Sequence, residues 1–428
     1  MPKAPAATLV AQNGLSQDSR STLIDSNPAS GPITVCHPVW RLGRGGLELQ
    51  LIHAVNGLLE DRFRHVVVVL DWSDENEALV QRIDPCVTIV RQSAALKSRN
   101  WSRVLAGILA EQSVDVVHVR GMSLLLDSLM AVELYGEARI ACSFHGFQTG
   151  IGEFQGVRRK VYREALLRCD DRWAVGCTAA RAIANELNLP ADAFGVVRNG
   201  VDTERFAPAI DRIAVRRDLG LPVDKAVVLC LGNLKPIKGQ SILLEAIGRM
   251  GAVAEQACFV FVGADGMGGL LSRWANERLE DIDIRFVGEA DDPVSWYQAA
   301  DLFVQPSISE GLSNSLLEAM SCGLAVAASN AGGNSEVVED GRTGMLVPAG
   351  DPASLALAVS HLVARPAVGI EMARASRERV IRDFAMQSMV TQLADRYIAL
   401  ADQTEASSED PDVGETANAP RRFASAGR

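Results

Sequence analysis

Two glutamates, Glu310 and Glu318, stand eight residues apart in the stretch "SISEGLSNSLLEAMSCG", residues 307–323. Glycine, serine and asparagine stand between them, which is typical of a loop, and an apolar helical pattern follows. The run that precedes them, "DLFVQPS" (301–307), is typical of a buried strand, so Glu310 is expected just beyond a strand end. An enclosed carboxylate without a partner is costly, and we therefore expect Glu310 to bind a polar ligand.

The predicted helix start adds a second kind of chemistry. The backbone N–H groups of Ser313 to Leu316 can hold a phosphate, because the first turn of a helix leaves its donors unpaired. Glu318 allows two interpretations: it binds ligand, or it completes a capping box, "SLLE" (315–318), with Ser315 as the N-cap and Glu318 at the third helical position. If both glutamates bind ligand, two hydrogen-bond acceptors flank an anion site. Such a site suits a nucleotide sugar, with its ribose on one side and its hexose on the other.

Three further loops carry residues that suit a charged ligand. Lys238 follows the strand-like run "AVVLCLG" (226–232) and can supply positive charge for a leaving diphosphate, or it is simply exposed in a turn. His145 ends the run "ARIACSF" and precedes "GFQTG", a polar stretch typical of an active-site loop, although a single histidine is often structural. The glycines of "GRGG" (43–46) open a helical pattern, where they allow close approach to phosphate or form a tight turn. They lack the spacing of a dinucleotide site.

Short apolar runs alternate with helical patterns along most of the chain, and this alternation predicts the elements that position these loops. The runs are apolar almost throughout, which is typical of strands buried on both faces of a parallel sheet. Strand–helix repetition predicts doubly wound α/β domains, whose ligands bind where the strands end. The predicted strands are 33–37, 65–70, 86–90, 114–119, 138–144 and 172–176 in the first half, and 226–232, 258–264, 282–288, 301–307 and 324–329 in the second.

The chain is expected to contain two such domains, because 428 residues exceed what one hydrophobic core usually holds. Asn-Gly at 199–200, followed by proline and charges, predicts the boundary. The predicted parts are a disordered segment 1–30, an N-terminal Rossmann-like domain 31–200, a C-terminal Rossmann-like domain 201–385, a helix 386–402 that packs back on the first domain, and a disordered tail 403–428.

The composition excludes several classes of protein. A net charge of -11 argues against nucleic acid as a partner. We find no long apolar run and no export signal, and the eight cysteines form no C-x-x-C pair, so we expect a reduced, cytoplasmic compartment. No His-rich or Asp-rich set has metal-ligand spacing. We therefore expect neither a metal nor a cofactor, the nucleotide sugar being a substrate.

The motifs together resemble those of glycosyltransferase family 4, whose members are retaining enzymes of the GT-B architecture with two Rossmann-like domains. The resemblance implies that domain 31–200 is the acceptor-side domain and that domain 201–385 binds the nucleotide-sugar donor. The resemblance covers roughly residues 33–400. Its ordered pieces are "GRGGLELQLIHAVNGL" (43–58), "SFHG" (143–146), "RNGVDTERFAP" (198–208), "LGNLKPIKGQSILLEAI" (231–247), "FVGADG" (261–266), "RFVGEADD" (285–292), the glutamate stretch, and "AGGNSEVVEDGRTGMLVPAGDP" (331–352).

This resemblance implies a role for each matching position. Glu310 would contact the donor sugar, Glu318 the ribose, and Lys238 the diphosphate, while His145 would lie close to the reacting centre. The family usually has an arginine where this chain has Asn233, which carries no charge; Lys235 would compensate if its side chain turned inward. Other donor-binding positions implied by the motifs are Gly311, Leu312, Ser313, Asn314, Ser315, Gly288, Gly45 and Gly46. Glu336 would cap its own helix.

The expected function is transfer of a sugar, with retention, from a nucleotide-diphosphate sugar to an acceptor hydroxyl. UDP is the expected nucleotide on family frequency alone, and the acceptor is expected to be a glycan or glycolipid of the cell surface. Two alternatives stay open: a nucleotide-sugar epimerase of the same architecture, and a non-catalytic nucleotide-sugar-binding protein. The basic stretch "VRRKVYREALLR" (157–168) is either a solvated helix face or a surface that contacts the inner face of the membrane.

Overall fold

The computed structural model describes residues 31–408, apart from residue 44 and the segments 59–61, 74–75, 93–99 and 147–155. The segments 1–30 and 409–428, which fall within the stretches predicted to be disordered, lie outside the described residues, as does most of "GFQTG". All the described helices and strands belong to one compact unit that begins at Ile33.

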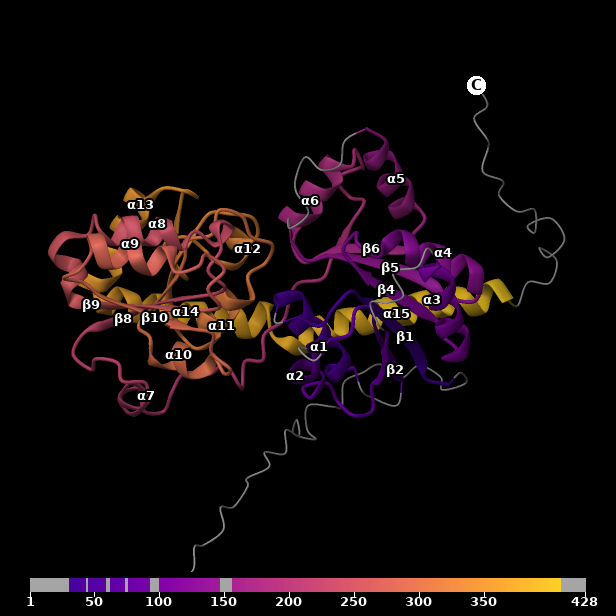
Figure 1. Ribbon diagram of the computed structural model, residues 1–428, viewed down its shortest axis with the longest axis horizontal. Helices are drawn as coiled ribbons and strands as arrows, with labels where there is room; N and C mark the ends of the chain where they lie inside the picture. The colour runs from indigo at the N-terminus through magenta and orange to yellow at the C-terminus, as the bar shows by residue number, and fades with distance from the viewer. Residues whose placement is uncertain are drawn as a thin grey trace, which may run out of the picture. The chain divides into compact units, whose positions relative to one another are not determined.

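The first domain is built on a seven-stranded sheet in which every paired neighbour runs parallel (Figure 1). Its strand order is β3-β2-β1-β4-β5-β6-β7, so the order reverses between β1 and β4. The strands are β1 Ile33–Val39, β2 Phe63–Val69, β3 Thr88–Arg91, β4 Val116–Arg120, β5 Arg139–Phe144, β6 Asp171–Ala174 and β7 Gly195–Val196.

The second domain repeats this topology with six parallel strands in the order β10-β9-β8-β11-β12-β13. They are β8 Ala226–Leu231, β9 Ala257–Val262, β10 Asp283–Gly288, β11 Leu302–Gln305, β12 Ala325–Ser329 and β13 Met345–Val347. The predicted fold class, two doubly wound parallel-sheet domains, is confirmed. The sequence reading missed β7 and β13, because runs of two and three residues are too short to show a strand pattern.

Helices cover both faces of each sheet (Figure 1), which is why the central strands β4, β11 and β12 are buried along their whole length. The helices of the first domain are α1 Gly46–Gly57, α2 Glu77–Val80, α3 Trp101–Glu111, α4 Leu125–Tyr135, α5 Gly156–Leu167 and α6 Cys177–Glu186. Those that follow are α7 Arg212–Asp218, η4 Pro236–Lys238, α8 Gln240–Ile247, η5 Gly251–Gln256, α9 Leu270–Arg278, α10 Val294–Ala299, α11 Asn314–Ser321, α12 Asn334–Val337, α13 Pro352–Ala364 and α14 Pro366–Asp383.

The last helix, α15 Met386–Ser408, returns to the first domain. Its buried residues Leu393 and Tyr397 share one hydrophobic cluster with Val35 of β1, Val116 of β4 and Trp173 of β6. The helix continues to Ser408, beyond the predicted end at residue 402. Side chains from the far end of the chain therefore belong to the core of the first sheet.

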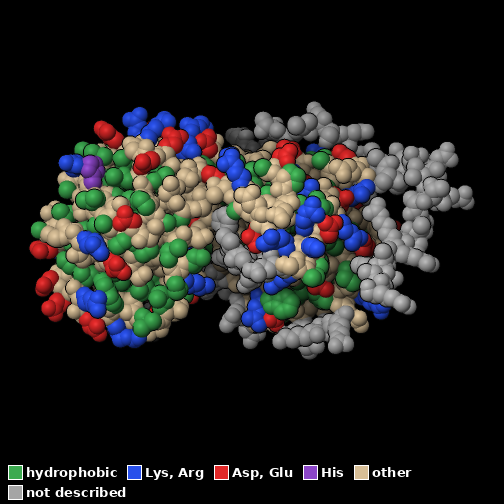
Figure 2. Space-filling view, turned by 90° about the horizontal axis from the view of Figure 1, so that it is seen from above, with side chains coloured by type: hydrophobic (Ala, Val, Ile, Leu, Met, Phe, Trp, Pro, Cys, Tyr) green, Lys and Arg blue, Asp and Glu red, His purple; other side chains and the backbone are tan. Residues whose placement is uncertain are grey.

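Charged side chains of both signs are interspersed on the face shown in Figure 2. Among the described residues, none of the helices taken singly is both long and apolar enough to cross a membrane, and only the pair α13 and α14, bent by 101° at their junction, meets that measure when the two are joined. Within the same residues, no group of three or more His, Cys, Asp or Glu side chains is arranged to hold a metal ion.

Candidate functional site

Glu310 lies in the loop after β11 and is held by three side chains. Its Oε2 accepts hydrogen bonds from Lys238 Nζ at 2.7 Å, Ser307 Oγ at 3.1 Å and Gln305 Nε2 at 3.2 Å. The exposed fractions of the Lys238 and Glu310 side chains are 27% and 13%, so this ion pair is shielded but reachable. The structure thus brings together two of the predicted residues that lie 72 positions apart in the sequence.

Gln305, the last residue of β11, organises the loop between the two glutamates, and the sequence reading missed it. Besides donating to Glu310, its Nε2 donates to Ser307 Oγ at 2.7 Å. Its Oε1 accepts from Ser313 Oγ at 3.2 Å and from Ser315 Oγ at 3.1 Å. A buried glutamine at the end of a strand was the available signal, because its amide must find partners in the loop that follows.

Two glycines allow the neighbouring loops to pack against this one. Gly239, with φ 68°, ends the short helix that carries Lys238, and a Cβ there would overlap the carbonyl oxygen of Pro306. Gly332 has φ 54°, and a Cβ there would overlap the carbonyl oxygen of Glu310. The strand-end loops of β8 and β12 therefore touch the loop of β11 backbone to backbone, which only glycine permits.

The start of α11 differs from the prediction. Ser313, not Ser315, is the N-cap, and its Oγ accepts from Leu316 N at 3.3 Å. Glu318 is therefore not at the third helical position of a capping box with Ser315, because the helix begins at Asn314, two residues before the start that a Ser315 N-cap implies. Ser313 is extended, with φ -73° and ψ 117°, which aims its hydroxyl at the first helical turn.

Glu318 instead accepts a hydrogen bond at its Oε2 from Tyr297 OH at 2.8 Å. Burial raises the pKa of the Glu318 carboxyl to about 7, although the bond from Tyr297 and the positive charge of Arg205 oppose this rise. Glu318 also lines a cavity of about 340 Å³ that includes Asn233. Other residues around this cavity are Leu49, His53 and Arg82 from the first domain and Gly232, Gly263, Glu289 and Asp291 from the second.

The start of α11 is bonded to the first domain through Asn314. Its Oδ1 accepts from Asn199 Nδ2 at 2.9 Å and from Gln50 Nε2 at 3.0 Å, and its Nδ2 donates to the Gly46 carbonyl at 3.1 Å. Asn199 Nδ2 also donates to the carbonyl of Leu312 at 3.1 Å. Gln50 and Asn199 lie in the motifs 43–58 and 198–208, but the sequence does not predict their role, because only the fold brings both to Asn314.

His145 lies after β5, against the glutamate loop. Its backbone packs so closely on Gly311 that a Cβ on Gly311 would overlap the His145 carbonyl oxygen. Its Nε2 is 2.9 Å from Ser143 Oγ, and its Nδ1, although buried, has no hydrogen-bond partner among the residues that the structure describes. Burial and the nearby Arg120 lower the pKa of His145 to about 3, so its imidazole is neutral at ordinary pH.

The other residues predicted for the site have different surroundings. Lys235 is exposed, with its side chain beside Gly266, so it does not turn inward toward Glu310. Gly45 is the N-cap of α1, and Gly46 is close enough to Asn314 that a Cβ would lie 2.9 Å from Asn314 Nδ2. Gly288 ends β10, where its carbonyl accepts from Gly263 N at 2.7 Å.

The sequence predicts that Glu336 caps its own helix, α12, but the structure shows no such cap. Its carboxylate accepts from Cys177 N at 2.9 Å and Thr178 N at 2.7 Å, which are the first backbone N–H groups of α6. A carboxylate is stabilising at such a position, because the N-terminus of a helix is partially positive. Glu336 thus holds the second domain to the first.

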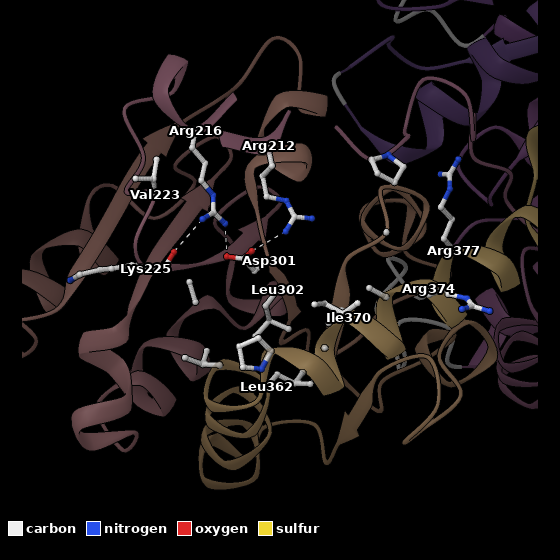
Figure 3. Close-up of a pocket in the computed structure, with 18 of the residues that line it drawn as sticks. Arg212, Arg216, Val223, Lys225, Asp301, Leu302, Leu362, Ile370, Arg374 and Arg377 are labelled. Carbon is white, nitrogen blue, oxygen red and sulfur yellow. Dashed lines mark hydrogen bonds and ion pairs between the residues drawn. The ribbon is translucent and has the colours of Figure 1, made fainter. Parts of the chain in front are cut away.

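A larger cavity, of about 870 Å³, lies away from these residues (Figure 3). It is lined by Ala226, Leu302 and Ala325, at the amino ends of β8, β11 and β12, opposite the edge where doubly wound sheets bind ligands. Its cations Arg212 and Arg216 are paired with Asp301, which also accepts from Val227 N at 2.8 Å. These charges hold α7 to the sheet, so the smaller cavity beside Glu318 is the better candidate site.

Two doubly wound domains whose strand-end loops contact each other define a protein of the GT-B class. Two family descriptions match the chain, "Glycosyltransferase Family 4" at residues 44–205 and "Glycosyl transferases group 1" at residues 225–365. The first match falls on the first domain and the second on the second domain. The chain therefore belongs to glycosyltransferase family 4.

Similar proteins are found among both curated and solved ones. D-inositol 3-phosphate glycosyltransferase 2 of Catenulispora acidiphila is 40% identical over 182 residues, 40% of this chain and 42% of that protein. A GDP-mannose-dependent monoacylated alpha-(1-6)-phosphatidylinositol monomannoside mannosyltransferase of Corynebacterium glutamicum is 26% identical over 74% of this chain and 85% of its own length.

The crystal structure of Anabaena HepE in complex with UDP shares the fold. Its TM-score is 0.75 at 20% identity, with 86% of this chain and 100% of that chain covered. The chain spans about half the length of three curated D-inositol 3-phosphate glycosyltransferases that it matches.

Proposed function

We propose that this protein transfers a sugar from a nucleoside-diphosphate sugar to an acceptor hydroxyl, with retention at the anomeric carbon. The observation that carries this proposal is the position of Glu310 and Glu318 on either side of the start of α11, with Lys238 bonded to Glu310. In the proposed complex Glu318 accepts from the ribose hydroxyls, Glu310 from the sugar hydroxyls, and the diphosphate lies between them at the helix start.

Lys238 is the proposed cation for the leaving diphosphate. An ammonium group has three donors, and Glu310 takes one of those of Lys238, so the others remain for phosphate oxygens. Charge that grows on the phosphate as the sugar bond breaks is stabilised by such a fixed cation and by the backbone N–H groups of the first turn of α11. In the proposed same-face route, the acceptor oxygen bonds to the anomeric carbon as the phosphate leaves and takes the acceptor's proton.

The proposed donor carries uridine, and the proposed acceptor is a glycan or glycolipid. A UDP complex of a protein with the same fold supports the first choice. Names of the curated relatives refer to an inositol phosphate and to a phosphatidylinositol monomannoside, which supports a hydroxylated acceptor with or without a lipid. Cell-surface polysaccharide or glycolipid synthesis is the corresponding process.

Asn233 favours a second candidate, a nucleotide-sugar-binding protein without turnover. It lines the cavity beside Glu318 as an uncharged side chain, and Lys235 is exposed rather than directed at the site. Of the two lysines predicted for the site, only Lys238 would then act on the diphosphate. This candidate predicts binding of the donor with no release of nucleotide in the presence of any acceptor.

Ligand-induced thermal stabilisation tests the donor site directly. The full chain would be measured with UDP, GDP, ADP and their glucose or mannose conjugates, beside Glu318→Gln and the matched control Glu245→Gln, an exposed glutamate on α8. We expect stabilisation by one nucleotide series in wild type and control, and its loss in Glu318→Gln. Stabilisation that survives in Glu318→Gln would contradict the ribose role of Glu318, and its absence with all nucleotides would contradict the function.

Nucleotide release then separates the two candidates. The donor that stabilises the protein would be incubated with inositol phosphates, phosphatidylinositol and oligosaccharides, with Glu310→Gln as the inactive reference. Acceptor-dependent release in wild type supports the transferase. Binding of the donor without release by any acceptor supports the non-catalytic protein.

We also propose that the first domain contacts the inner membrane surface through α5, as a protein otherwise located in the cytoplasm. The stretch 157–168 carries five Lys and Arg residues and one Glu, and Val157 and Val161 are 77% and 42% exposed. Basic side chains are visible among the charges of the face in Figure 2, the side on which α5 lies in Figure 1. Cations with exposed apolar neighbours suit an anionic lipid surface.

Flotation with vesicles tests this contact. We expect the protein to float with anionic vesicles, weakly with neutral ones, and less when Arg158 and Lys160 are both changed to Glu. Arg374→Glu with Arg382→Glu on α14 is the control with the same change of charge. Equal flotation with both kinds of vesicle, or an equal effect of the two double variants, would contradict a role for α5.

A further inference from the structure

A row of polar side chains crosses the core of the first domain and ends at His145. His65 Nδ1 is 3.0 Å from His37 Nε2, and Arg120 NH1 is 3.0 Å from His37 Nδ1. Arg120 also lies beside the hydroxyl of Tyr397 of α15, and its positive charge opposes the rise that burial causes in the pKa of that hydroxyl. The row continues from Tyr397 OH to His118 Nδ1 at 2.7 Å, from His118 Nε2 to Ser143 Oγ at 2.8 Å, and from Ser143 Oγ to His145 Nε2 at 2.9 Å.

The histidines in this row are neutral. His37, His65 and His118 are buried, and their burial together with the charge of Arg120 holds the pKa of each imidazole below its usual value, as it does for His145. A neutral imidazole has one nitrogen that donates and one that accepts. Each hydrogen bond in the row therefore constrains the next.

Arg120 sets the direction of the row, because a guanidinium donates and cannot accept. His37 Nδ1 must therefore accept from Arg120 and His37 Nε2 must carry the proton, which it donates to His65. On the other side, the positive charge of Arg120 attracts the hydroxyl oxygen of Tyr397 and repels its proton. The hydroxyl proton of Tyr397 then has His118 Nδ1 as its acceptor.

The same logic continues to the site. His118, accepting at Nδ1, carries its proton on Nε2 and donates to Ser143. Ser143, accepting from His118, donates its hydroxyl proton to His145 Nε2. His145 must then carry its proton on Nδ1.

The unpaired atoms of the row agree with this direction. Bonds directed outward from Arg120 leave one N–H without a partner at each end, on His65 Nε2 and on His145 Nδ1. Among the described residues, both of these nitrogens are buried and lack a hydrogen-bond partner. Each inner imidazole nitrogen of the row, on His37 and His118, has one.

From this geometry we infer that Arg120, Tyr397, His118 and Ser143 are positioning residues that hold His145 as the Nδ1–H tautomer, so that it donates a hydrogen bond to a hydroxyl of the donor sugar. The inference deepens the proposed function and rests on it for the identity of the ligand. An unpartnered buried donor is costly, and a sugar hydroxyl beside Gly311 and Glu310 would supply the missing acceptor.

A fixed tautomer also limits what His145 can do. With Nδ1 protonated and Nε2 occupied by Ser143, neither nitrogen is free to remove a proton from a substrate. His145 is therefore a donor and not a general base. An epimerase needs acid–base residues around the sugar, so this arrangement favours transfer over epimerisation.

Histidine-selective 15N labelling and two-bond 1H–15N correlation spectra of the full chain test the tautomer without any ligand or turnover. His145→Gln identifies the signals of His145 by their loss. We expect protonated Nδ1 and unprotonated Nε2 in wild type. In Ser143→Ala the proton should move largely to Nε2, and in Tyr397→Phe the signals of His118 and His145 should become those of mixed tautomers.

Tyr135→Phe, a change of the same kind on α4 outside the row, should leave these signals as in wild type. A proton on Nε2 of His145 in wild type, or no change in Ser143→Ala, would overturn the inference. If Tyr397→Phe alone has no effect, the positioning role of Tyr397 is overturned. A nucleotide sugar that stabilises the protein should shift the NMR signal of the His145 Nδ1 proton. Stabilisation without that shift overturns the sugar hydroxyl as the acceptor. The expected tautomer without binding of any nucleotide counts against the proposed function alone.

Discussion

Replacing Glu318 with glutamine should make the unliganded protein more stable at alkaline pH. The carboxyl of Glu318 is enclosed and has the Tyr297 hydroxyl as its hydrogen-bond donor, and burial raises its pKa from 4.5 to about 7. The folded state therefore holds this proton more tightly than the unfolded state does. The associated stability is fully present below about pH 4.5 and is lost as the pH rises through about 7.

The size of the effect follows from the two pKa values. At 1.36 kcal/mol for each pKa unit, a rise from 4.5 to about 7 corresponds to about 3–4 kcal/mol. Because Glu318 lines a cavity that water can enter, we expect a smaller loss, about 2–3 kcal/mol. Glutamine keeps an oxygen for Tyr297 but carries no charge, so the variant should not show this loss.

Urea unfolding followed by circular dichroism at pH 4.5 and pH 8.5 measures the effect. The difference in unfolding free energy between Glu318→Gln and wild type should rise by about 2–3 kcal/mol from the lower to the higher pH. Other titrating groups are common to both proteins and cancel. In the control Glu245→Gln, the difference from wild type should be the same at both pH values.

The same substitution should have the opposite effect on ligand binding. If ionised Glu318 accepts from two ribose hydroxyls, its replacement should weaken nucleotide binding by about 10- to 100-fold, which corresponds to loss of a hydrogen bond to a charged group. A variant that is no more stable than wild type at pH 8.5 and binds nucleotide equally well would refute the assignment of Glu318 as an enclosed ribose ligand.

Three further predictions concern the neighbouring loops. Lys238→Ala should lower turnover by about 10²–10³-fold while changing KM little, because its charge is needed as the diphosphate leaves; steady-state kinetics with unchanged kcat would contradict this. Gly332→Ala should lower the free energy of unfolding by about 3 kcal/mol, since its Cβ would overlap the Glu310 carbonyl. The control Gly341→Ala, also at positive φ but with open space around it, should lower it by about 1 kcal/mol. Equal shifts in urea midpoint would argue against the close packing of these loops. Nucleotide release should persist in EDTA, and complete loss that magnesium or manganese restores would show that a metal is required.

Much of the fold could be predicted because the pattern is local. A strand buried on both faces of a parallel sheet must be apolar along its length, and β4, β11 and β12 show this in their residues. The order of loops after such strands then indicated which polar residues, Glu310, Lys238 and His145 among them, lie at the ligand-binding edge. The bond between Lys238 and Glu310 agrees with that expectation.

Capping was less predictable, because it depends on one backbone conformation or on a distant partner. Ser313 and Ser315 are both good N-cap residues, and only the extended backbone of Ser313 decides between them. The sequence predicts that Glu336 caps the helix nearest to it in sequence, but Glu336 caps α6, whose first residue, Cys177, precedes it by 159 positions. A short motif does not record which of two helices is closer in space.

The sequence alone indicates which residues are candidates for binding a nucleotide sugar and at which strand ends they stand. Tertiary structure alone decided how those residues are held: the amide of Gln305 between Glu310 and the serines, the hydroxyl of Tyr297 on Glu318, and the row from Arg120 through Tyr397 to His145. Tyr397 is 279 residues from its partner His118. The physical reason is that hydrogen-bond partners in a protein core are chosen by packing distance, and packing brings together residues whose separation along the chain leaves no local pattern.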